Sequence, residues 1–365
     1  MAALNEPSVS MGDALRSFAG KRVFVTGHTG FKGSWLAFIL SELGAEVMGY
    51  ALAPGTSPSH FELLSLERRV RHVIGDTRDF AVLRRQLTSF EPEYVLHLAA
   101  QSLVRRSYED PIETLQTNVL GSANLLEAIK GCASVRSLVY VTSDKCYENV
   151  EWVWGYRETD RLGGHDPYSA SKAAAEIVFS AFARSYFAAR KDLGAASARA
   201  GNVIAGGDWA PDRVVPDCVR ALQAGAAVRI RNPGATRPWQ HVLEPLSGYL
   251  LLAAALHKQP VRYGGAWNFG PSTQEVRTVH DVASSIVQHF GRGSIESVPT
   301  ADGRHEAGYL QLNCDKAYQL LGWQPRWGVG KALQATAEWY GAVLNGADAE
   351  RITRAQVREY FTELP

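Results

Sequence analysis

The sequence predicts an α/β protein with a doubly wound parallel sheet and a smaller C-terminal lobe. Three observations support this prediction. Short apolar runs alternate with helix-patterned segments over the first 200 residues, a glycine-rich turn follows the first apolar run, and the alternation breaks down after residue 200. Regular alternation of this kind is typical of parallel sheets with helices on both faces. The chain has 365 residues, which is more than one compact core usually holds, so two lobes are favoured.

The first strand–helix–strand unit lies near the N-terminus. Residues 21–26 (KRVFVT) form a short apolar run that predicts a strand. Residues 34–43 carry apolar side chains at helical spacing, and Gly44 ends the predicted helix. Residues 46–52 predict a second strand. A strand, a turn, a helix and a second strand form the unit from which parallel sheets are built.

The same alternation continues along the chain and then stops. Further strands are predicted over 70–74, 94–99, 137–142 and 195–199, and helices over 81–90, 114–129 and 168–190. Glycine, proline and tryptophan become frequent beyond residue 200, as in GGDWAPDR and RNPGATRPWQ. We therefore expect a flexible N-terminal arm (1–16), a nucleotide-binding domain (17–200) to which part of 240–272 returns, and a substrate-binding lobe (201–365).

Composition excludes several classes of function. The chain has 38 basic and 37 acidic residues and a net charge of +1, so it has no general attraction for nucleic acid or an anionic membrane. No apolar run reaches the length of a membrane span. The four cysteines form no C-x-x-C pair, and no cluster has zinc-ligand spacing, so no metal site is predicted. Reduced thiols of this kind favour a cytoplasmic protein.

The glycine-rich turn predicts a dinucleotide site. Residues 26–33 read TGHTGFKG, with a G-x-x-G-x-x-G spacing between the first strand and the first helix. Gly27 permits the tight turn, Gly30 lets a pyrophosphate approach the backbone, and Gly33 lets the helix pack close to the sheet. The helix N-terminus supplies free N–H groups and a positive dipole end. This position makes the motif typical of a Rossmann-type domain, although a purely structural turn is the alternative.

The residues after the second and third strands leave the choice between NAD and NADP open. A carboxylate at the end of the second strand would select the ribose hydroxyl of NAD. This chain has Tyr50 there, and no adjacent arginine favours NADP. Asp76, after the third strand, is a candidate partner for the adenine amino group, or else a turn or capping residue.

A tyrosine and a lysine stand four residues apart at the start of the helix over 168–190. The sequence Tyr168-Ser-Ala-Ser-Lys172 places both side chains on one face of that helix. Lys172 is expected to lower the pKa of Tyr168 by stabilising its phenolate. Such a pair removes a proton from an alcohol while the hydride of the same carbon passes to a nicotinamide.

The segment 142–172 carries a family resemblance. It reads TSDKCYENVEWVWGYRETDRLGGHDPYSASK and contains Ser143-Asp144-Lys145 directly after a predicted strand. Together with the glycine loop, it resembles the nucleotide-sugar 4,6-dehydratases of the extended short-chain dehydrogenase/reductase superfamily. The CDP-glucose branch is the most similar, and the resemblance spans roughly residues 18–345. The supporting segments are GHTGFKGSWL (27–36), AGNVIAGGDWAPDR (200–213) and RPWQHVLEPLSGY (237–249).

The resemblance implies a reaction and a set of roles. Tyr168 and NAD oxidise the sugar at C4 while Ser143 holds the C4 oxygen. Asp144 then serves as the acid and Lys145 as the base that eliminate water across C5 and C6. The implied product is CDP-4-dehydro-6-deoxyglucose, a precursor of deoxysugars for a surface polysaccharide such as lipopolysaccharide. The implied cofactor-binding residues are Gly27, Thr29, Gly30, Phe31, Lys32, Gly33, Asp76, Ala99, Tyr168 and Lys172.

The resemblance also implies substrate and subunit contacts. A nucleoside diphosphate carries about two negative charges, which the planar fork of arginine suits. The expected substrate-binding residues are Asn202, Arg213, Arg237, Glu306 and Tyr309. Alanine and glycine occupy positions 307 and 308, where related enzymes can have two arginines, and this weakens the case for that loop. The long helices over 114–129 and 168–188 imply a homodimer through a helix-pair interface.

Alternatives remain at this point. Many relatives have glutamate where this chain has Lys145, and some UDP-sugar dehydratases share the lysine, so the residue does not name the nucleotide. A 4-epimerase uses the same glycine loop and the Tyr168–Lys172 pair but needs no acid and base for elimination. A non-catalytic NAD-sensing protein of the same fold would not need the Tyr168–Lys172 pair at all.

Overall fold

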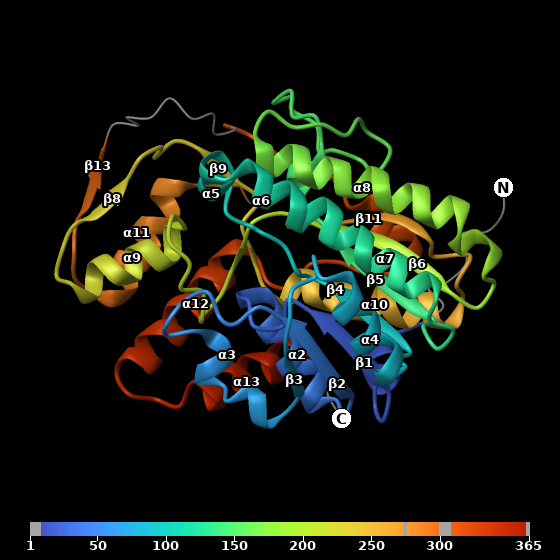
Figure 1. Ribbon diagram of the computed structural model, residues 1–365. Coiled ribbons are helices and arrows are strands. Elements are labelled where there is room, and N and C mark those ends of the chain that lie inside the picture. Colours follow the sequence, from blue (N-terminus) through green and yellow to red (C-terminus); the bar gives the residue numbers. More distant parts are fainter. Residues whose placement is uncertain (1–8, 273–275, 299–307, 363–365) are drawn as a thin grey trace.

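The computed structural model describes residues 9–272, 276–298 and 308–362 (Figure 1). Its centre is a wholly parallel seven-stranded sheet with the order β11-β6-β5-β4-β1-β2-β3, so the predicted α/β class is confirmed. The sheet strands are β1 (Arg22–Thr26), β2 (Glu46–Ala51), β3 (Arg71–Ile74), β4 (Tyr94–His97), β5 (Ser137–Val141), β6 (Gly194–Ala200) and β11 (Gly265–Phe269).

The strand order reverses next to β1. From β1 the chain adds β2 and β3 on one side and then crosses to add β4, β5 and β6 on the other. Thr26, the last residue of β1, pairs with Tyr50 on β2 and His97 on β4. In an open parallel sheet, ligands bind at the carboxyl ends of the strands beside such a reversal. The topology therefore places the candidate site above β1 and β4.

Helices cover both faces of the sheet (Figure 1). One apolar core lies between the sheet and α2 and α10, and a second lies between the sheet and α4, α7 and α8. The helices up to the end of β6 are α1 (Met11–Arg16), α2 (Phe31–Glu42), α3 (His60–Leu63), α4 (Phe80–Phe90), α5 (Val104–Glu109), α6 (Pro111–Leu115), α7 (Ser122–Lys130) and α8 (Pro167–Ser185), with short turns η1 (Leu66–Arg68), η2 (Gln116–Gly121), η3 (Asp144–Cys146) and η4 (Phe187–Ala189).

The helix predicted over 114–129 is built from three parts. Helices α6 and α7 are joined by η2, a turn of π-helix over Gln116–Gly121. A Cβ atom on Gly121 would lie 2.6 Å from Oγ1 of Thr77, so the helix passes very close to the loop after β3. Apolar periodicity cannot reveal such a turn, because one extra residue in a helix changes the spacing only locally.

The chain beyond residue 200 forms a lobe and then returns to the sheet. Helices α9 (Val214–Gln223) and α11 (Val279–Phe290) pack with strands β8 (Val228–Ile230) and β13 (Ile295–Ser297) at one end of the molecule (Figure 1). Between them in sequence, α10 (Leu243–Lys258) packs on β5 and β6, and β11 extends the sheet beside β6. The remaining elements are β7 (Val203–Ile204), β9 (Thr236–Arg237), β10 (Gln240–His241), β12 (Arg277–Thr278), η5 (Ala317–Leu321), α12 (Val329–Leu344) and α13 (Ala349–Tyr360).

The C-terminal helices pack on the first domain. Arg354 of α13 forms an ion pair with Glu42 at the end of α2, at 2.7 Å. Arg69 joins the same cluster through Glu42, at 2.9 Å. Trp35 of α2 donates a hydrogen bond to the carbonyl of Gly206. These contacts tie α2 to segments from beyond residue 200.

The structure corrects the expectation of a flexible arm for part of the N-terminus. Residues 1–8 lie outside the described residues, but Met11–Arg16 form helix α1, which Ser10 caps by accepting a hydrogen bond from the backbone of Asp13. Leu15 is fully buried, and α1 packs on α10. Six residues are too few to show a clear periodicity, so the apolar pattern does not predict this helix.

Two further observations bear on the type of protein. Within the described ranges, no helix is long and apolar enough to cross a membrane. The same ranges contain no group of three or more histidine, cysteine, aspartate or glutamate side chains that could hold a metal ion.

Candidate active site

Two glycines of the nucleotide loop occupy positions where a side chain would collide with the backbone. Gly27 has a φ of +77°, and a Cβ atom there would lie 2.7 Å from the backbone nitrogen of Ala99. A Cβ atom on Gly33 would lie 2.1 Å from the carbonyl oxygen of Gly27. The first glycine lets the loop cross the end of β4, and the second lets α2 pack against the loop.

The N-terminus of α2 is open to an anionic ligand. Its N-cap residue, Gly30, has no side chain to cap the helix, and its first turn contains no acidic residue. The first N–H groups and the positive end of the helix dipole are therefore available for a pyrophosphate. The hydroxyl of Thr29 donates a hydrogen bond to the carbonyl of Leu52, which ties the loop to the end of β2. This cradle fits the pyrophosphate of a dinucleotide.

Lys32, in the first turn of α2, directs its side chain into the catalytic cavity. Its ammonium lies 3.5 Å from the hydroxyl of Tyr249. Burial, aided by the nearby positive charges of Arg213 and Lys172, lowers the pKa of Lys32 to about 8. The loop thus supplies a side chain to the site as well as backbone groups.

The residues after β2 and β3 form a local network. Tyr50 is fully buried and donates a hydrogen bond to the backbone carbonyl of Asp76. The Asp76 carboxylate accepts three hydrogen bonds from Arg78, two from the guanidinium and one from the backbone. Although burial raises the pKa of Asp76, the Arg78 contacts lower it more, so it is below the usual value overall. The role of Asp76 toward adenine stays a prediction.

The tripeptide Ser143-Asp144-Lys145 forms a short turn at the carboxyl end of β5. Ser143 caps η3 by accepting a hydrogen bond from the backbone of Lys145, and its hydroxyl donates to Oδ1 of Asp144 at 2.9 Å. Asp144 is buried, and Lys145 is half-buried beside it. A Cβ atom on Gly201 would lie 2.9 Å from Asp144, so a glycine there makes room for the carboxyl group.

Burial gives Asp144 the character of an acid. Desolvation raises its pKa above the usual value of a carboxyl group, against the opposing charges of Lys145 and Arg237. A carboxyl group with a raised pKa holds its proton at a pH where an exposed one has lost it. Asp144 is therefore suited to donate a proton to a leaving oxygen.

Tyr168 and Lys172 stand in the first turns of α8, where Asp166 caps the helix by accepting a hydrogen bond from the backbone of Ser169. Both side chains are buried and line the cavity. Burial raises the pKa of Tyr168 to about 12, a change that Ser143 and Arg213 partly oppose. Burial lowers the pKa of Lys172 to about 8.

These values differ from the sequence expectation, in which Lys172 lowers the pKa of Tyr168. The groups that lower it in this structure are Ser143, by a hydrogen bond, and Arg213, by its charge. The charge with the largest effect on Lys172 is Glu176, one turn further along α8. The pKa of Tyr168 is raised and the pKa of Lys172 is lowered because burial disfavours the charged form of both side chains.

The side chains predicted to be catalytic share one cavity of about 620 Å³ between the sheet and the lobe. This volume suits a sugar nucleotide. The predicted residues that line it are Lys32, Ser143, Asp144, Lys145, Tyr168, Lys172, Asn202, Arg213 and Arg237.

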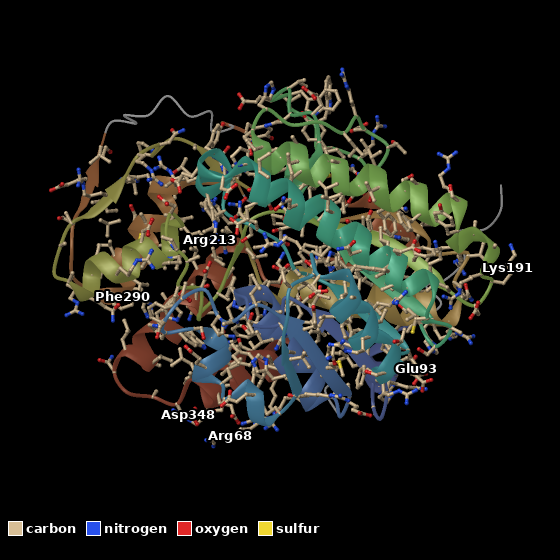
Figure 2. The ribbon with its side chains drawn as sticks, viewed as in Figure 1. Arg68, Glu93, Lys191, Arg213, Phe290 and Asp348 are labelled. Atoms are coloured by element: carbon tan, nitrogen blue, oxygen red, sulfur yellow. The ribbon has the colours of Figure 1, made fainter. Side chains whose placement is uncertain are left out.

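Two of the predicted substrate residues are constrained by protein contacts. Arg213 lies near the middle of the molecule (Figure 2), where it donates hydrogen bonds to the carboxylate of Asp208 and the hydroxyl of Ser102. Tyr309 lies outside the cavity lining, and its backbone carbonyl accepts a hydrogen bond from Asn149. Glu306 falls outside the described residues.

Sequence reasoning missed three arginines of the cavity, which are Arg105, Arg229 and Arg231. Arg231 donates to the carboxylate of Asp212 at 2.9 Å, and Arg105 lies 3.6 Å from the same oxygen. Arg105 comes from α5 and Arg231 from the segment after β8, so no motif connects them. Only their placement in the fold identifies them.

Comparisons with known proteins agree with this arrangement. The family model described as GDP-mannose 4,6 dehydratase matches residues 24–336. A CDP-glucose 4,6-dehydratase of Salmonella typhimurium is 48% identical over 347 residues, which cover 94% of this chain and 97% of the relative.

Two solved structures have the same fold. A dTDP-glucose 4,6-dehydratase of Streptomyces venezuelae, a double mutant with NAD bound, has a TM-score of 0.76 at 24% identity, and the match covers 91% of this chain and 99% of that one. A UDP-glucose 4-epimerase of Thermotoga maritima has a TM-score of 0.76 at 25% identity, covering 88% and 99%. Dehydratases and epimerases thus share this fold.

Proposed function

Because this chain belongs to the GDP-mannose 4,6-dehydratase family, we propose that it is an NAD-dependent hydro-lyase that converts CDP-glucose to CDP-4-dehydro-6-deoxyglucose and water. The observation that carries the proposal is the meeting of a buried acid, an amine and a Tyr–Lys pair in one cavity. The high identity to a CDP-glucose 4,6-dehydratase along nearly the whole chain supports the choice of reaction and nucleotide.

The first step is oxidation at C4 of the sugar. Tyr168 removes the proton of the C4 hydroxyl, and Ser143 holds the oxygen as its charge develops. Ser143 and Arg213 lower the pKa of Tyr168, and we propose that protonated Lys172 adds its positive charge to their effect as the phenolate forms. The loop over Gly27–Gly33 would hold NAD, which would supply a two-electron hydride acceptor.

The second step is elimination of water across C5 and C6. The C4 ketone makes the C5 hydrogen acidic, and the Lys145 amine removes that proton. Asp144 donates its proton to the C6 hydroxyl, which leaves as water. The two groups are adjacent in sequence. Burial suits Asp144 to the role of the acid, and Lys145 beside it is proposed as the base.

The third step would complete the product. The hydride taken from C4 would return to C6 and a proton to C5, so the reaction would have no net oxidation or reduction. The cavity walls must therefore retain the intermediate between the first step and the third. Arg213 contributes by joining the lobe to the loop after β4 through Asp208 and Ser102.

The alternatives are less well supported. A 4-epimerase shares the fold but has no use for a buried acid next to an amine, and the relative with 48% identity is a dehydratase. A UDP-sugar dehydratase would use the same catalytic groups, so nucleotide preference must be measured. A non-catalytic NAD sensor gives no reason for a buried Tyr168 and Lys172 in a cavity of this size.

The experiment that tests the proposal is incubation of the protein with NAD and CDP-glucose, followed by mass spectrometry, with UDP-glucose and dTDP-glucose in parallel. Loss of 18 mass units, about one water, from CDP-glucose in preference to the others is expected. An isomer without a change of mass would indicate an epimerase. Equal or better turnover of another nucleotide would overturn the choice of CDP-glucose.

The protein is further proposed to act as a cytoplasmic homodimer that supplies a deoxysugar for a surface polysaccharide. Support for the dimer comes from large apolar side chains that are exposed on adjacent helices of one face. Leu120 of η2 and Ile177 of α8 each expose 59% of their surface. A second copy that pairs its own α7 and α8 with these helices would cover them.

A further inference from the structure

A buried charge lies directly behind the catalytic residues. Glu176 stands one turn beyond Lys172 on α8 and exposes 2% of its side chain. Its carboxylate accepts hydrogen bonds from the hydroxyl of Thr142, the hydroxyl of Ser197 (2.8 Å) and the guanidinium of Arg199 (2.7 Å). Thr142 is the residue that precedes the acid–base tripeptide. Glu176 therefore ties α8 to the end of β5 and to β6.

Arg199 extends this contact to the other end of the tripeptide. The guanidinium donates hydrogen bonds to the hydroxyl of Tyr147, at 2.8 Å, and to the carbonyl of Glu158, at 3.1 Å. It also lies over the Tyr147 ring, 4.9 Å from its centre. Tyr147 in turn donates to the side chain of Asn268 on β11, at 2.7 Å. The segment from Thr142 to Tyr147 is thus held at both ends by one ion pair.

We propose that the buried Glu176–Arg199 pair is a positioning unit for the dehydratase reaction. It fixes Ser143, Asp144 and Lys145 relative to the helix of Tyr168, and its carboxylate keeps Lys172 in the charged form that the first step requires. This inference rests on the proposed function. Glu176 and Arg199 touch no reacting atom, since neither lines the cavity, and they act through Thr142, Tyr147 and Lys172.

The proposal requires the negative charge of Glu176, and not only its packing, because that charge favours the ammonium form of Lys172. A buried ion pair costs desolvation energy, and apolar residues of similar volume often replace such pairs without loss of stability. Near Lys172, Glu176 supplies the largest charge that favours the ammonium form. The other titratable groups that face Lys172 are Tyr168 on α8, Cys146 on η3, His97 on β4 and Lys32 on α2.

The test is the pH dependence of the first step alone, measured from pH 6 to 10 as the rise of absorbance at 340 nm with CDP-glucose and NAD. Glu176→Gln is placed in a Lys145→Ala background, where elimination stops, so that loss of the Asp144 proton adds no second alkaline limb. The amide keeps the volume but removes the charge next to Lys172. We expect the alkaline limb of this rate profile to move to lower pH by about one unit relative to Lys145→Ala alone, and the rate at the optimum of Lys145→Ala to fall about tenfold. A rate that falls equally at every pH, with the limb in place, would mean that Glu176 is only structural and would overturn the inference.

The matched control is Glu244→Gln. Glu244 is also fully buried and accepts hydrogen bonds from the hydroxyl of Tyr360 and the backbones of Arg326 and Trp327, but it lies outside the cavity lining. In the same Lys145→Ala background, this variant should lose stability and keep the alkaline limb of Lys145→Ala. If the alkaline limb of Glu244→Gln moved as far as that of Glu176→Gln, the effect of Glu176 would not be a local one on Lys172.

A second variant keeps the test decisive if Glu176→Gln does not fold. The double substitution Glu176→Met with Arg199→Met replaces the pair by apolar residues and leaves no single buried charge. It should fold and show the same downward move of the limb, and an unmoved limb would overturn the inference. Wild-type turnover of CDP-glucose is measured first. If the wild type does not turn over CDP-glucose, the proposed function fails. If the wild type is active but the alkaline limb lies at the same pH with and without the substitutions at Glu176 and Arg199, only this inference fails.

Discussion

At the scale of single residues, the proposed mechanism gives the neighbours Asp144 and Lys145 the roles of acid and base in one elimination reaction. Asp144 is buried and accepts a hydrogen bond from Ser143, while Lys145 is half-buried at the cavity wall. Both side chains line the same cavity, so both are available to one bound sugar. Each role can be tested by removing one group at a time.

The first prediction concerns Lys145→Ala. Without the amine, Tyr168 should still remove the C4 proton, so the hydride transfer occurs and elimination stops. Absorbance at 340 nm should build on the enzyme, while product formation falls by roughly a hundredfold or more. Stopped-flow absorbance together with mass spectrometry of the product measures both. Unchanged turnover would remove Lys145 from the mechanism.

The second prediction concerns Asp144. Because burial raises its pKa, the proton it donates is lost as pH rises through that raised value, and elimination should slow over the same range. Asp144→Asn cannot supply a proton, so elimination should stop at every pH. Lys145 still removes the C5 proton in this variant, and deuterium from the solvent should enter C5. Lys145→Ala should show no such exchange, and exchange in both variants would show that another group is the base.

At the scale of elements, the approach of α2 to its own loop decides whether the cofactor site forms. Gly33 lets the helix begin against the carbonyl of Gly27, and Gly27 lets the loop pass the end of β4. The open N-terminus of α2 then faces the ligand, because neither Gly30 nor the first turn supplies a competing side chain. The cofactor site is thus formed largely by the position of one helix.

The third prediction concerns Gly33→Ala. The added methyl would lie 2.1 Å from the Gly27 carbonyl, so α2 must move away from the loop. We expect NAD affinity to fall at least tenfold, or about 1.4 kcal/mol, and the melting temperature to drop. Titration of NAD by calorimetry measures the affinity.

Gly330→Ala is the control for that prediction. Gly330 also lies in the first turn of a helix, α12, and a Cβ atom there meets nothing within 4 Å. Its NAD affinity should equal that of the wild type, with stability equal or slightly higher, since alanine favours a helix more than glycine does. Equal NAD affinity in Gly33→Ala and Gly330→Ala would contradict the steric argument.

Local apolar patterns in the sequence predict the regular strands and helices of the sheet domain. The alternation of strands and helices up to β6 follows from apolar runs, and the catalytic turn follows from the resemblance over 142–172. The helix α1 and the π-helical turn of η2 were not predicted, because they depend on packing against α10 and on the approach of Gly121 to Thr77. The cavity arginines were missed for the same reason, since Arg105 and Arg231 meet only through the fold.

At the scale of the whole molecule, the cavity forms where distant parts of the chain meet. Lys32 comes from the first helix of the sheet domain, Asp144 from the end of β5, and Arg237 from β9 in the lobe. The division into residues 17–200 and 201–365 stays a prediction, and α10 and β11 show how closely the two parts interleave. Motion of the lobe relative to the sheet would open this cavity.

The fourth prediction concerns the proposed dimer. The double substitution Leu120→Glu with Ile177→Glu places two charges on the exposed apolar face of η2 and α8. We expect the protein to become monomeric, because buried unpaired charges oppose association. Size-exclusion chromatography with light scattering gives the mass.

Val261→Glu is the control for the dimer. Val261 is also apolar and exposes 77% of its surface, but it lies after α10, away from the proposed interface. This variant should keep the mass of the wild type. A monomeric wild type, or a double variant with unchanged mass, would contradict the proposed interface.

The return of α10 and β11 to the sheet has a consequence for how the protein is made. While the ribosome has delivered only the first 200 residues, β6 is an open edge strand, and α1 has no α10 to pack on. At about 5–20 residues per second, the stretch from the end of β6 to the end of β11 takes on the order of three to fourteen seconds to synthesise. The nascent chain therefore exposes an unpaired edge during that time, which makes it a natural client of chaperones that shield such edges.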